Sequence, residues 1–313
     1  MTCEDSLPIY NCPAKPVDII LDTDTYNEID DQYAIAYTLA NCDKINVLGF
    51  TVAPFRKACC VKDIPESQIK SREEIIRVLT YCKRTDYIDK IYIGSDRFLA
   101  DKNTPVLSPA AEFIVEASKG YNKDKPLYIC AIGAITNVAS AILIDPDIVN
   151  RVCVVWLGGT ALDYYKNKEY NMHQDVIAAR IVIGSAVPFV QLPTFGVVSE
   201  FSTTEYELEH WLKGKNPICD YLYNSTLAFA EKRSKTGAWS KVIWDVVSPA
   251  WLLNENDRFM QGRPENRYLP TLKGYRYTKS KNRNKMFYVH KINRDALMSD
   301  MFYKLANFKG FNK

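Results

Sequence analysis

The sequence lacks an apolar run long enough to span a membrane, and residues 1–11 lack the basic flank and apolar core of a secretory leader. It also lacks low-complexity stretches, a repeat of fixed period and any linker-like segment, which excludes solenoid and propeller folds. A chain of 313 residues can bury a large core. We therefore expect one cytoplasmic domain over residues 1–313, without a membrane partner.

An excess of either charge is missing as well. The 40 lysines and arginines nearly cancel the 37 aspartates and glutamates, and the two signs are interspersed. Such a balance offers no electrostatic reason for a nucleic-acid partner. Residues 275–291 are more basic and hold four aromatic residues, but exposed late hairpins often have this composition. We expect no nucleic-acid partner.

None of the nine cysteines belongs to a Cys-x-x-Cys pair, so the sequence predicts neither a disulfide framework nor a zinc site. We expect most of them to be buried thiols. The adjacent Cys59 and Cys60 lie between Lys57 and Lys62, and nearby cations favour the reactive thiolate. They form a candidate reactive pair, against the alternative of two inert thiols.

The sequence does contain a regular alternation of apolar runs and helix-compatible segments. Strands are expected at residues 17–21, 45–52, 90–93, 127–132 and 152–157. Helices are expected at 29–40, 66–84, 110–119, after 135, at 175–184 and through much of 203–253. Residues 267–308 suggest a hairpin and a final helix. The alternation predicts an α/β fold, with a mostly parallel, open, Rossmann-like sheet, helices on both faces and a helical C-terminal half.

An acidic loop, residues 22–31, follows the first expected strand. Its four aspartates are Asp22, Asp24, Asp30 and Asp31. Carboxylates crowded in a folded site repel one another and need a cation to stay ionised, and oxygen-only ligands favour calcium or magnesium. Ligand sites of parallel sheets lie outside the carboxyl ends of the strands, where this loop is expected. Two glycine turns, residues 133–137 and 158–160, follow later strands at the same edge.

One interpretation of this loop is phosphoryl transfer. A strand ending in Asp22-Thr23-Asp24-Thr25 resembles the haloacid-dehalogenase family, in which the first aspartate is the nucleophile and the second the general acid. That family also needs a distant acidic pair, whereas Asp30-Asp31 follows the loop at once. A phosphatase using Asp22 and Asp24 therefore remains an alternative.

The loop and three later segments together resemble the nucleoside hydrolase family. That family has an N-terminal Asp-x-Asp followed shortly by Asp-Asp, as at residues 22–31. Gly133-Ala134-Ile135-Thr136-Asn137 resembles its glycine-to-threonine-asparagine turn. Glu169-Tyr170-Asn171 after Gly158-Gly159 resembles its ribose-binding segment, and Trp244-Asp245 resembles its last ligand-bearing helix. The resemblance runs from about residue 17 to residue 254, and implies calcium-dependent hydrolysis of ribonucleosides by a homodimer or homotetramer.

The resemblance also implies a role for each matching residue. The implied Ca²⁺ ligands are Asp24, Asp31, the Thr136 carbonyl and Asp245. Asp24 would also take a proton from the attacking water, and Asp30 would bind the ribose hydroxyls. Asn171 and Glu169 would contact the 3′ and 5′ hydroxyls, and Asn27 is a further sugar candidate, with a plain turn residue as its alternative. Asp22 would organise the loop through hydrogen bonds.

The base side distinguishes branches of the family. Many members have histidine before the late calcium aspartate, whereas this chain has Trp244, which cannot donate a proton but can stack on a purine. This resembles the purine-specific, inosine-adenosine-guanosine-preferring branch, and a buried core residue is the alternative interpretation of Trp244. Phe55 is a candidate second stacking surface. The acidic loop is two residues longer than the common form, and a catalytically inactive nucleoside- or ribose-binding protein of the same fold remains a further alternative.

Overall fold

The computed structural model describes residues 12–13, 16–56, 60–164, 167–234, 237–272, 276–281 and 284–310. Cys59 of the candidate reactive pair lies outside these ranges. Four cysteines, Cys82, Cys130, Cys153 and Cys219, are buried free thiols, as the sequence predicts. Across the described ranges, no helix combines the length and apolar character needed to cross a bilayer.

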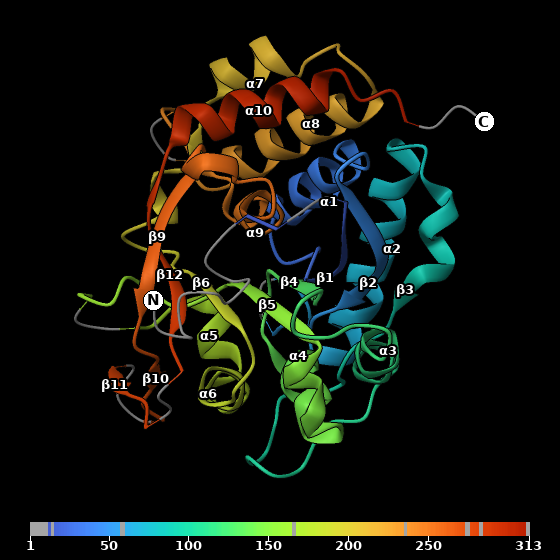
Figure 1. Ribbon diagram of the computed structural model, residues 1–313. Coiled ribbons are helices and arrows are strands. Elements are labelled where there is room, and N and C mark those ends of the chain that lie inside the picture. The colour runs from blue at the N-terminus through green and yellow to red at the C-terminus, as the bar shows by residue number, and fades with distance from the viewer. Residues whose placement is uncertain are drawn as a thin grey trace.

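The core of the molecule is an eight-stranded sheet in the order β3-β2-β1-β4-β5-β6-β12-β9 (Figure 1). Its strands are β1 (Val17–Thr23), β2 (Ile45–Val52), β3 (Ile91–Tyr92), β4 (Leu127–Ala131), β5 (Val152–Leu157), β6 (Phe189–Leu192), β9 (Met260–Glu265) and β12 (Met286–Ile292). All neighbours run parallel except β9, which runs antiparallel to β12. The central strands are buried along nearly their whole length, which explains their continuous apolar runs.

Helices cover both faces of this sheet, as expected. One face packs against α1 (Asp30–Ala40), α2 (Ile64–Tyr81), α7 (Glu205–Trp211), α8 (Pro217–Glu231), α9 (Val247–Trp251) and α10 (Arg294–Ala306). The other packs against α3 (Pro109–Ser118), α4 (Thr136–Ile144) and α6 (Val176–Gly184), which follows the short α5 (Tyr170–Gln174). Figure 1 shows these two groups of helices on opposite sides of the strands. Two hydrophobic clusters, one on each face, form the core.

The strand order reverses between β1 and β4. From β1 the chain moves outward through β2 and β3, then crosses back to β4 and continues outward through β5 and β6. Such a reversal leaves a crevice at the carboxyl ends of the two central strands. The backbone N–H of Ile132 donates to the carbonyl of Asp22 at 2.9 Å, so the ends of β4 and β1 are joined at this point. The acidic loop therefore opens beside the glycine turn that follows β4.

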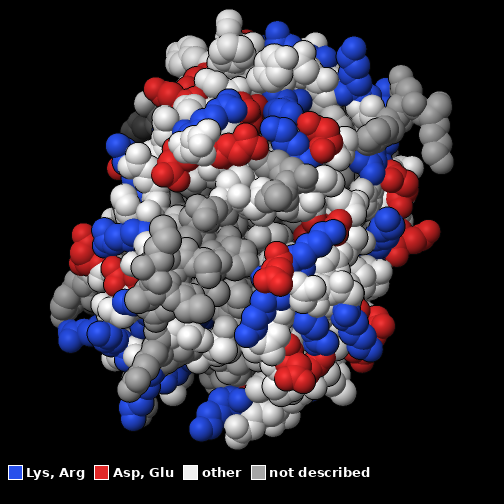
Figure 2. All heavy atoms as spheres, viewed as in Figure 1, with Lys and Arg blue, Asp and Glu red and all other residues white. Residues whose placement is uncertain are grey.

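The C-terminal half differs from the expectation in its strands. The strand β12 enters the main sheet between β6 and β9, and the hairpin is formed by the separate pair β10 (Tyr268–Pro270) and β11 (Tyr277–Lys279). The sequence interpretation has no strand at β6. Both β6 and β12 are positioned by pairing with segments distant in the sequence, and local periodicity cannot predict such pairing. On the face shown in Figure 2, lysines and arginines intermingle with acidic residues.

Candidate active site

The acidic loop turns sharply after β1 and then starts α1. The backbone N–H of Asn27 donates to the Asp24 carbonyl at 2.8 Å, and the Asn27 amide donates to Asp24 Oδ2 at 3.1 Å. Asp24, Asp30 and Asp31 are only 2%, 3% and 2% exposed. Asn27, predicted as a sugar contact, thus also holds the predicted catalytic carboxylate. The side chains of Thr23 and Thr25 hydrogen-bond to each other, so Thr25 stabilises the longer loop.

Asp22 lies beneath the loop. Its Oδ1 accepts from the Thr51 hydroxyl at 2.7 Å and from the Asn137 amide at 2.8 Å, which ties β1 to β2 and α4. Its Oδ2 is buried and has no hydrogen-bond partner among the described residues. Burial raises the pKa of Asp22 to about 6, although these two hydrogen bonds act in the opposite direction. Asp22 is 0% exposed and does not line the cavity, a position that does not favour the phosphatase alternative.

A cavity of about 250 Å³ opens above the carboxyl ends of β1, β4 and β5. It is lined by Asp24, Asn27, Glu28, Asp30, Asp31, Ile132, Leu157, Glu169, Tyr170, Asn171, Thr194, Phe195, Trp244 and Asp245. Small-molecule sites generally measure roughly 300–1,000 Å³, so this cavity lies just below that range and suits only a small ligand. Eight of the ten residues predicted as site residues meet in this one cavity, although they lie up to 221 positions apart in the sequence, from Asp24 to Asp245.

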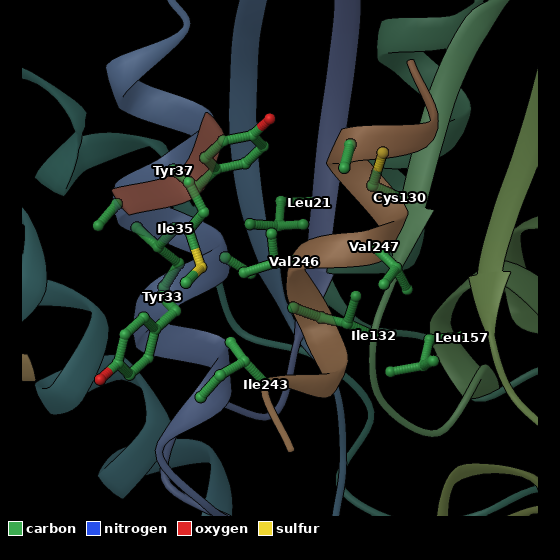
Figure 3. Close-up of a cluster of buried hydrophobic side chains, with 14 of the residues drawn as sticks. Leu21, Tyr33, Ile35, Tyr37, Cys130, Ile132, Leu157, Ile243, Val246 and Val247 are labelled. Carbon is green, nitrogen blue, oxygen red and sulfur yellow. The ribbon is translucent and has the colours of Figure 1, made fainter. Parts of the chain in front are cut away.

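The segment that carries Trp244 and Asp245 is positioned by the core. The 3₁₀ turn η5 (Trp244–Val246) leads into α9, and Figure 3 shows Ile243, Val246 and Val247 of this segment between α1 and the strands. All three side chains are fully buried. Packing of these apolar neighbours therefore turns Asp245 toward the acidic loop, where it is 4% exposed.

Glu169 and Asn171 form the polar wall next to β5. Glu169 is the N-cap of α5, and its carboxylate accepts backbone N–H bonds from Gly159 at 2.7 Å and from Asn171 and Met172 at 2.9 Å. Burial raises its pKa to about 7, against the effect of these bonds. The Asn171 amide donates to the carbonyls of Ile132 at 3.1 Å and Leu157 at 3.0 Å. Since both amide hydrogens are engaged, its oxygen is the atom to receive a hydroxyl.

Gly133 leaves the space that the Asp24 carboxylate occupies. A Cβ atom at this position would lie 2.8 Å from Ala53 Cβ and 3.1 Å from Asp24 Oδ1. The Gly133 carbonyl is in turn held by Trp156 Nε1 at 3.0 Å. A glycine is thus required here by the close approach of Ala53 and of a site carboxylate, rather than by the strand-to-helix turn alone.

Aromatic side chains also line the cavity, among them Trp244 and Phe195. Trp244 packs partly against the core but also lines the cavity, so it is not simply a core residue. The ring of Phe195 meets it edge-on, with centroids 5.5 Å apart and planes at 71°. Phe195 is 44% exposed and follows β6 by three residues. The sequence interpretation misses Phe195 because it does not recognise β6; the position of this residue after an apolar segment was the available signal.

Two predicted site residues lie elsewhere. Phe55 is 0% exposed and does not line the cavity, whereas Phe195 does. Thr136 is the first residue of α4, and its hydroxyl donates to Asp175 at 2.8 Å. The cavity is instead lined by Ile132, at the end of β4. The sequence signal that could have identified Ile132 is its place between the apolar strand and the glycine turn, at the sheet edge where ligand sites form.

The carboxyl groups of the cavity raise one another's pKa values. Asp31 has a pKa of about 7, raised mainly by burial and then by Asp30, and it shares a side-chain hydrogen bond with Asp245. Burial, followed by Asp30, Asp31 and Asp24, raises the pKa of Asp245 well above its ordinary value. Two carboxyl groups in this contact need a proton or a cation between them. A fixed positive charge stands nearby on Lys241, whose Nζ lies 3.0 Å from Asp30 Oδ1.

These groups fit a hard cation in their chemistry. Three buried carboxyls, Asp24, Asp31 and Asp245, line one cavity together with Ile132. Oxygen donors of this kind are the ligands that calcium and magnesium prefer. Within the described part of the chain, no three His, Cys, Asp or Glu side chains are arranged closely enough to form a metal site. The site therefore suits a hard cation because of its oxygen donors and because Asp31 and Asp245 are in contact.

The sequence profile of the inosine-uridine preferring nucleoside hydrolases matches residues 19–298, which include every group of the cavity. The chain belongs to the nucleoside hydrolase family. Members of this family are N-glycosyl hydrolases and are typically metal-dependent. An uncharacterised protein of Schizosaccharomyces pombe is 30% identical to this chain over 88 residues, which are 27% of this chain and 28% of that protein.

Solved structures share the nucleoside hydrolase fold. A plant nucleoside hydrolase superimposes with a TM-score of 0.74 at 16% identity, covering 93% of this chain and 99% of its own. A purine-preferring ribonucleoside hydrolase from Gardnerella vaginalis gives 0.72 at 19% identity, and an inosine-guanosine nucleoside hydrolase gives 0.72 at 15%. Each of these two matches covers 93% of this chain and 98% of the other. The fold expected from the sequence is thus confirmed.

Proposed function

We propose that this chain hydrolyses the N-glycosidic bond of ribonucleosides, with a preference for purine nucleosides, and releases free base and ribose. The observation that carries the proposal is a single small cavity lined both by carboxylates and by aromatic rings. A nucleoside has the matching halves, a polyhydroxylated sugar and a flat base. Family membership supports the reaction type.

Cleavage of this bond develops positive charge on the ribose and negative charge on the departing base. Asp24 would accept a proton from the attacking water, with the Asn27 amide holding its carboxylate in place. Asp30 and the Asn171 oxygen would hold ribose hydroxyls, and Glu169 would accept from the 5′ hydroxyl. These contacts orient the sugar before attack.

The departing base would stack on Trp244, with Phe195 beside it. A purine presents a larger face than a pyrimidine, so an aromatic wall favours purines. No histidine is among the described residues that line the cavity, which leaves protonation of the base to solvent. The purine preference of a structurally similar hydrolase from Gardnerella vaginalis agrees with this proposal.

We propose Ca²⁺ as the metal, held by Asp24, Asp31, Asp245 and, in place of Thr136, the carbonyl of Ile132. When bound, the ion would orient the attacking water and lower its pKa modestly. Unfolding experiments test it without turnover. Calcium at about a hundredfold excess over its dissociation constant should stabilise the protein by about 3 kcal/mol. An Asp31→Asn variant should lose this gain, and equal stability with calcium and with a chelator would contradict calcium binding.

The first assay is release of reducing sugar from inosine and from uridine, each with calcium and with a chelator. Calcium-dependent release from inosine well above uridine is expected, and Asp24→Asn should abolish it. Equal rates would leave the hydrolase but remove the purine preference. Binding of inosine without any release would instead support the non-catalytic binding protein.

The cellular compartment, the oligomeric state and the partners of the enzyme stay predictions. We propose a cytoplasmic homodimer or homotetramer that uses only a small-molecule partner. Light scattering on a purified sample would distinguish these two assemblies, and a monomer would contradict both.

A further inference from the structure

A buried lysine stands behind the sugar side of the cavity. Lys241 belongs to the two-residue strand β8 (Lys241–Val242), which pairs antiparallel with β7 (Ser202–Thr203). Its side chain is 7% exposed. Its Nζ contacts Glu28 Oε2 at 2.9 Å, Asp30 Oδ1 at 3.0 Å and the Val242 carbonyl at 2.8 Å. An ammonium group has three hydrogens, so these three acceptors satisfy it completely.

Both carboxylates held by Lys241 belong to the cavity lining. Asp30 opens α1, and the N-cap residue Ile29 provides no side-chain hydrogen bond to this helix end. The Asp30 carboxylate accepts a hydrogen bond from its own backbone N–H, which is a contact within one residue. Lys241 adds a restraint from a strand more than two hundred residues away in the sequence, through a charge-assisted bond to one carboxylate oxygen.

We propose that Lys241 is a positioning residue that determines the preference for ribose over 2′-deoxyribose, acting through Asp30. The inference rests on the proposed function of the cavity. With Oδ1 fixed by Lys241, Asp30 presents its second oxygen to the sugar, where the 2′ hydroxyl is the group that only a ribonucleoside can donate. A site built around a hydroxyl rejects an analogue that lacks it, provided that the acceptor is held in place.

The test is a competition between inosine and 2′-deoxyinosine in one tube, which gives the ratio of the two kcat/KM values. This ratio does not depend on how much of the sample is folded. Lys241→Met keeps an unbranched side chain one atom shorter and removes its charge, and it should lower the ratio at least about tenfold. The loss should fall on inosine, with 2′-deoxyinosine nearly unaffected. Lys241→Arg, which keeps the cation, should recover part of the ratio.

The matched control is Lys213→Met, which removes an exposed pair with Glu209 and should leave the ratio unchanged. An equal loss for both nucleosides in Lys241→Met would mean that the residue is merely structural, and would overturn the inference. If that variant does not fold, Asp30→Asn is compared with Asp30→Asn/Lys241→Met, which leaves no unpaired charge at Asp30. The single and the double variant should give the same inosine to 2′-deoxyinosine ratio. A lower ratio in the double variant would show that Lys241 does not act through Asp30.

A binding measurement separates this inference from the proposed function. Fluorescence titration in the Asp24→Asn background gives dissociation constants for the same two nucleosides without turnover. A collapse of this binding preference in Lys241→Met would support the positioning role even if the native chain proved inactive. Turnover of inosine by the native chain, with an unchanged preference in Lys241→Met, would retain the hydrolase and reject the role of Lys241.

Discussion

Replacing Asp22 by asparagine should make the protein less sensitive to pH. The asparagine side chain would keep the Oδ1 acceptor for Thr51 and Asn137, while a neutral amide would take the place of the partnerless Oδ2. The native carboxylate has to be ionised in a fully buried position without a hydrogen bond to that oxygen from any described residue. The variant removes this cost and preserves the links between β1, β2 and α4.

The magnitude follows from the pKa of Asp22, which burial raises from 3.8 to about 6. Below pH 3.8 both folded and unfolded chains carry the proton, so the group has no effect on stability. As the pH rises from 3.8 to about 6, the unfolded chain ionises first, and the folded state loses stability. Two pH units correspond to about 3 kcal/mol, all of it lost from the native protein at neutral pH.

Urea denaturation in the presence of a chelator measures this effect at about pH 4, 5, 6 and 7. The native protein should lose about 3 kcal/mol relative to Asp22→Asn across this range, because the other buried carboxyls titrate in both proteins and cancel. Asp18→Asn, in the same strand at a less buried position, is the control for the substitution itself. Parallel stability curves for the native protein and Asp22→Asn would refute the reasoning.

Three further predictions concern the cavity. Gly133→Ala should lower kcat about tenfold or more, because its Cβ would displace the Asp24 carboxylate, and circular dichroism should show an intact fold. Trp244→Ala should lower kcat/KM for inosine relative to uridine by about tenfold, the equivalent of one lost aromatic contact, as measured by sugar release. Glu169→Gln should reduce kcat/KM for inosine but leave 5′-deoxyinosine little changed, because we propose the lost carboxylate oxygen as the acceptor of the 5′ hydroxyl.

Each of these predictions has an opposite outcome. Native kcat in Gly133→Ala would mean that Asp24 does not depend on the space beside Gly133. An equal loss for inosine and uridine in Trp244→Ala would assign Trp244 to the core. Equal losses for inosine and its 5′-deoxy analogue in Glu169→Gln would make Glu169 only the cap of α5, whose N–H groups it accepts.

Much of the fold could be predicted because local sequence and local structure agree. The apolar run at 45–52 matches β2 residue for residue, and Ser108 caps α3 by accepting from the Ala111 N–H at 3.2 Å. The strands β6 and β12 could not be predicted in the same way. Each is short or borders polar residues, and pairing between them, at Val190 and Phe287, joins segments almost a hundred residues apart.

The sequence by itself determined the chemistry of the site, because the acidic loop, Glu169-Tyr170-Asn171 and Trp244-Asp245 are contiguous motifs whose functional groups can be read directly. Only the tertiary structure decided which neighbours face these groups. It placed Phe55 outside the cavity lining and Phe195 and Ile132 within it, and it set Lys241 against Asp30. The physical reason is that a motif specifies donors and acceptors along the chain, whereas strand order and helix packing determine the side chains that meet across the crevice.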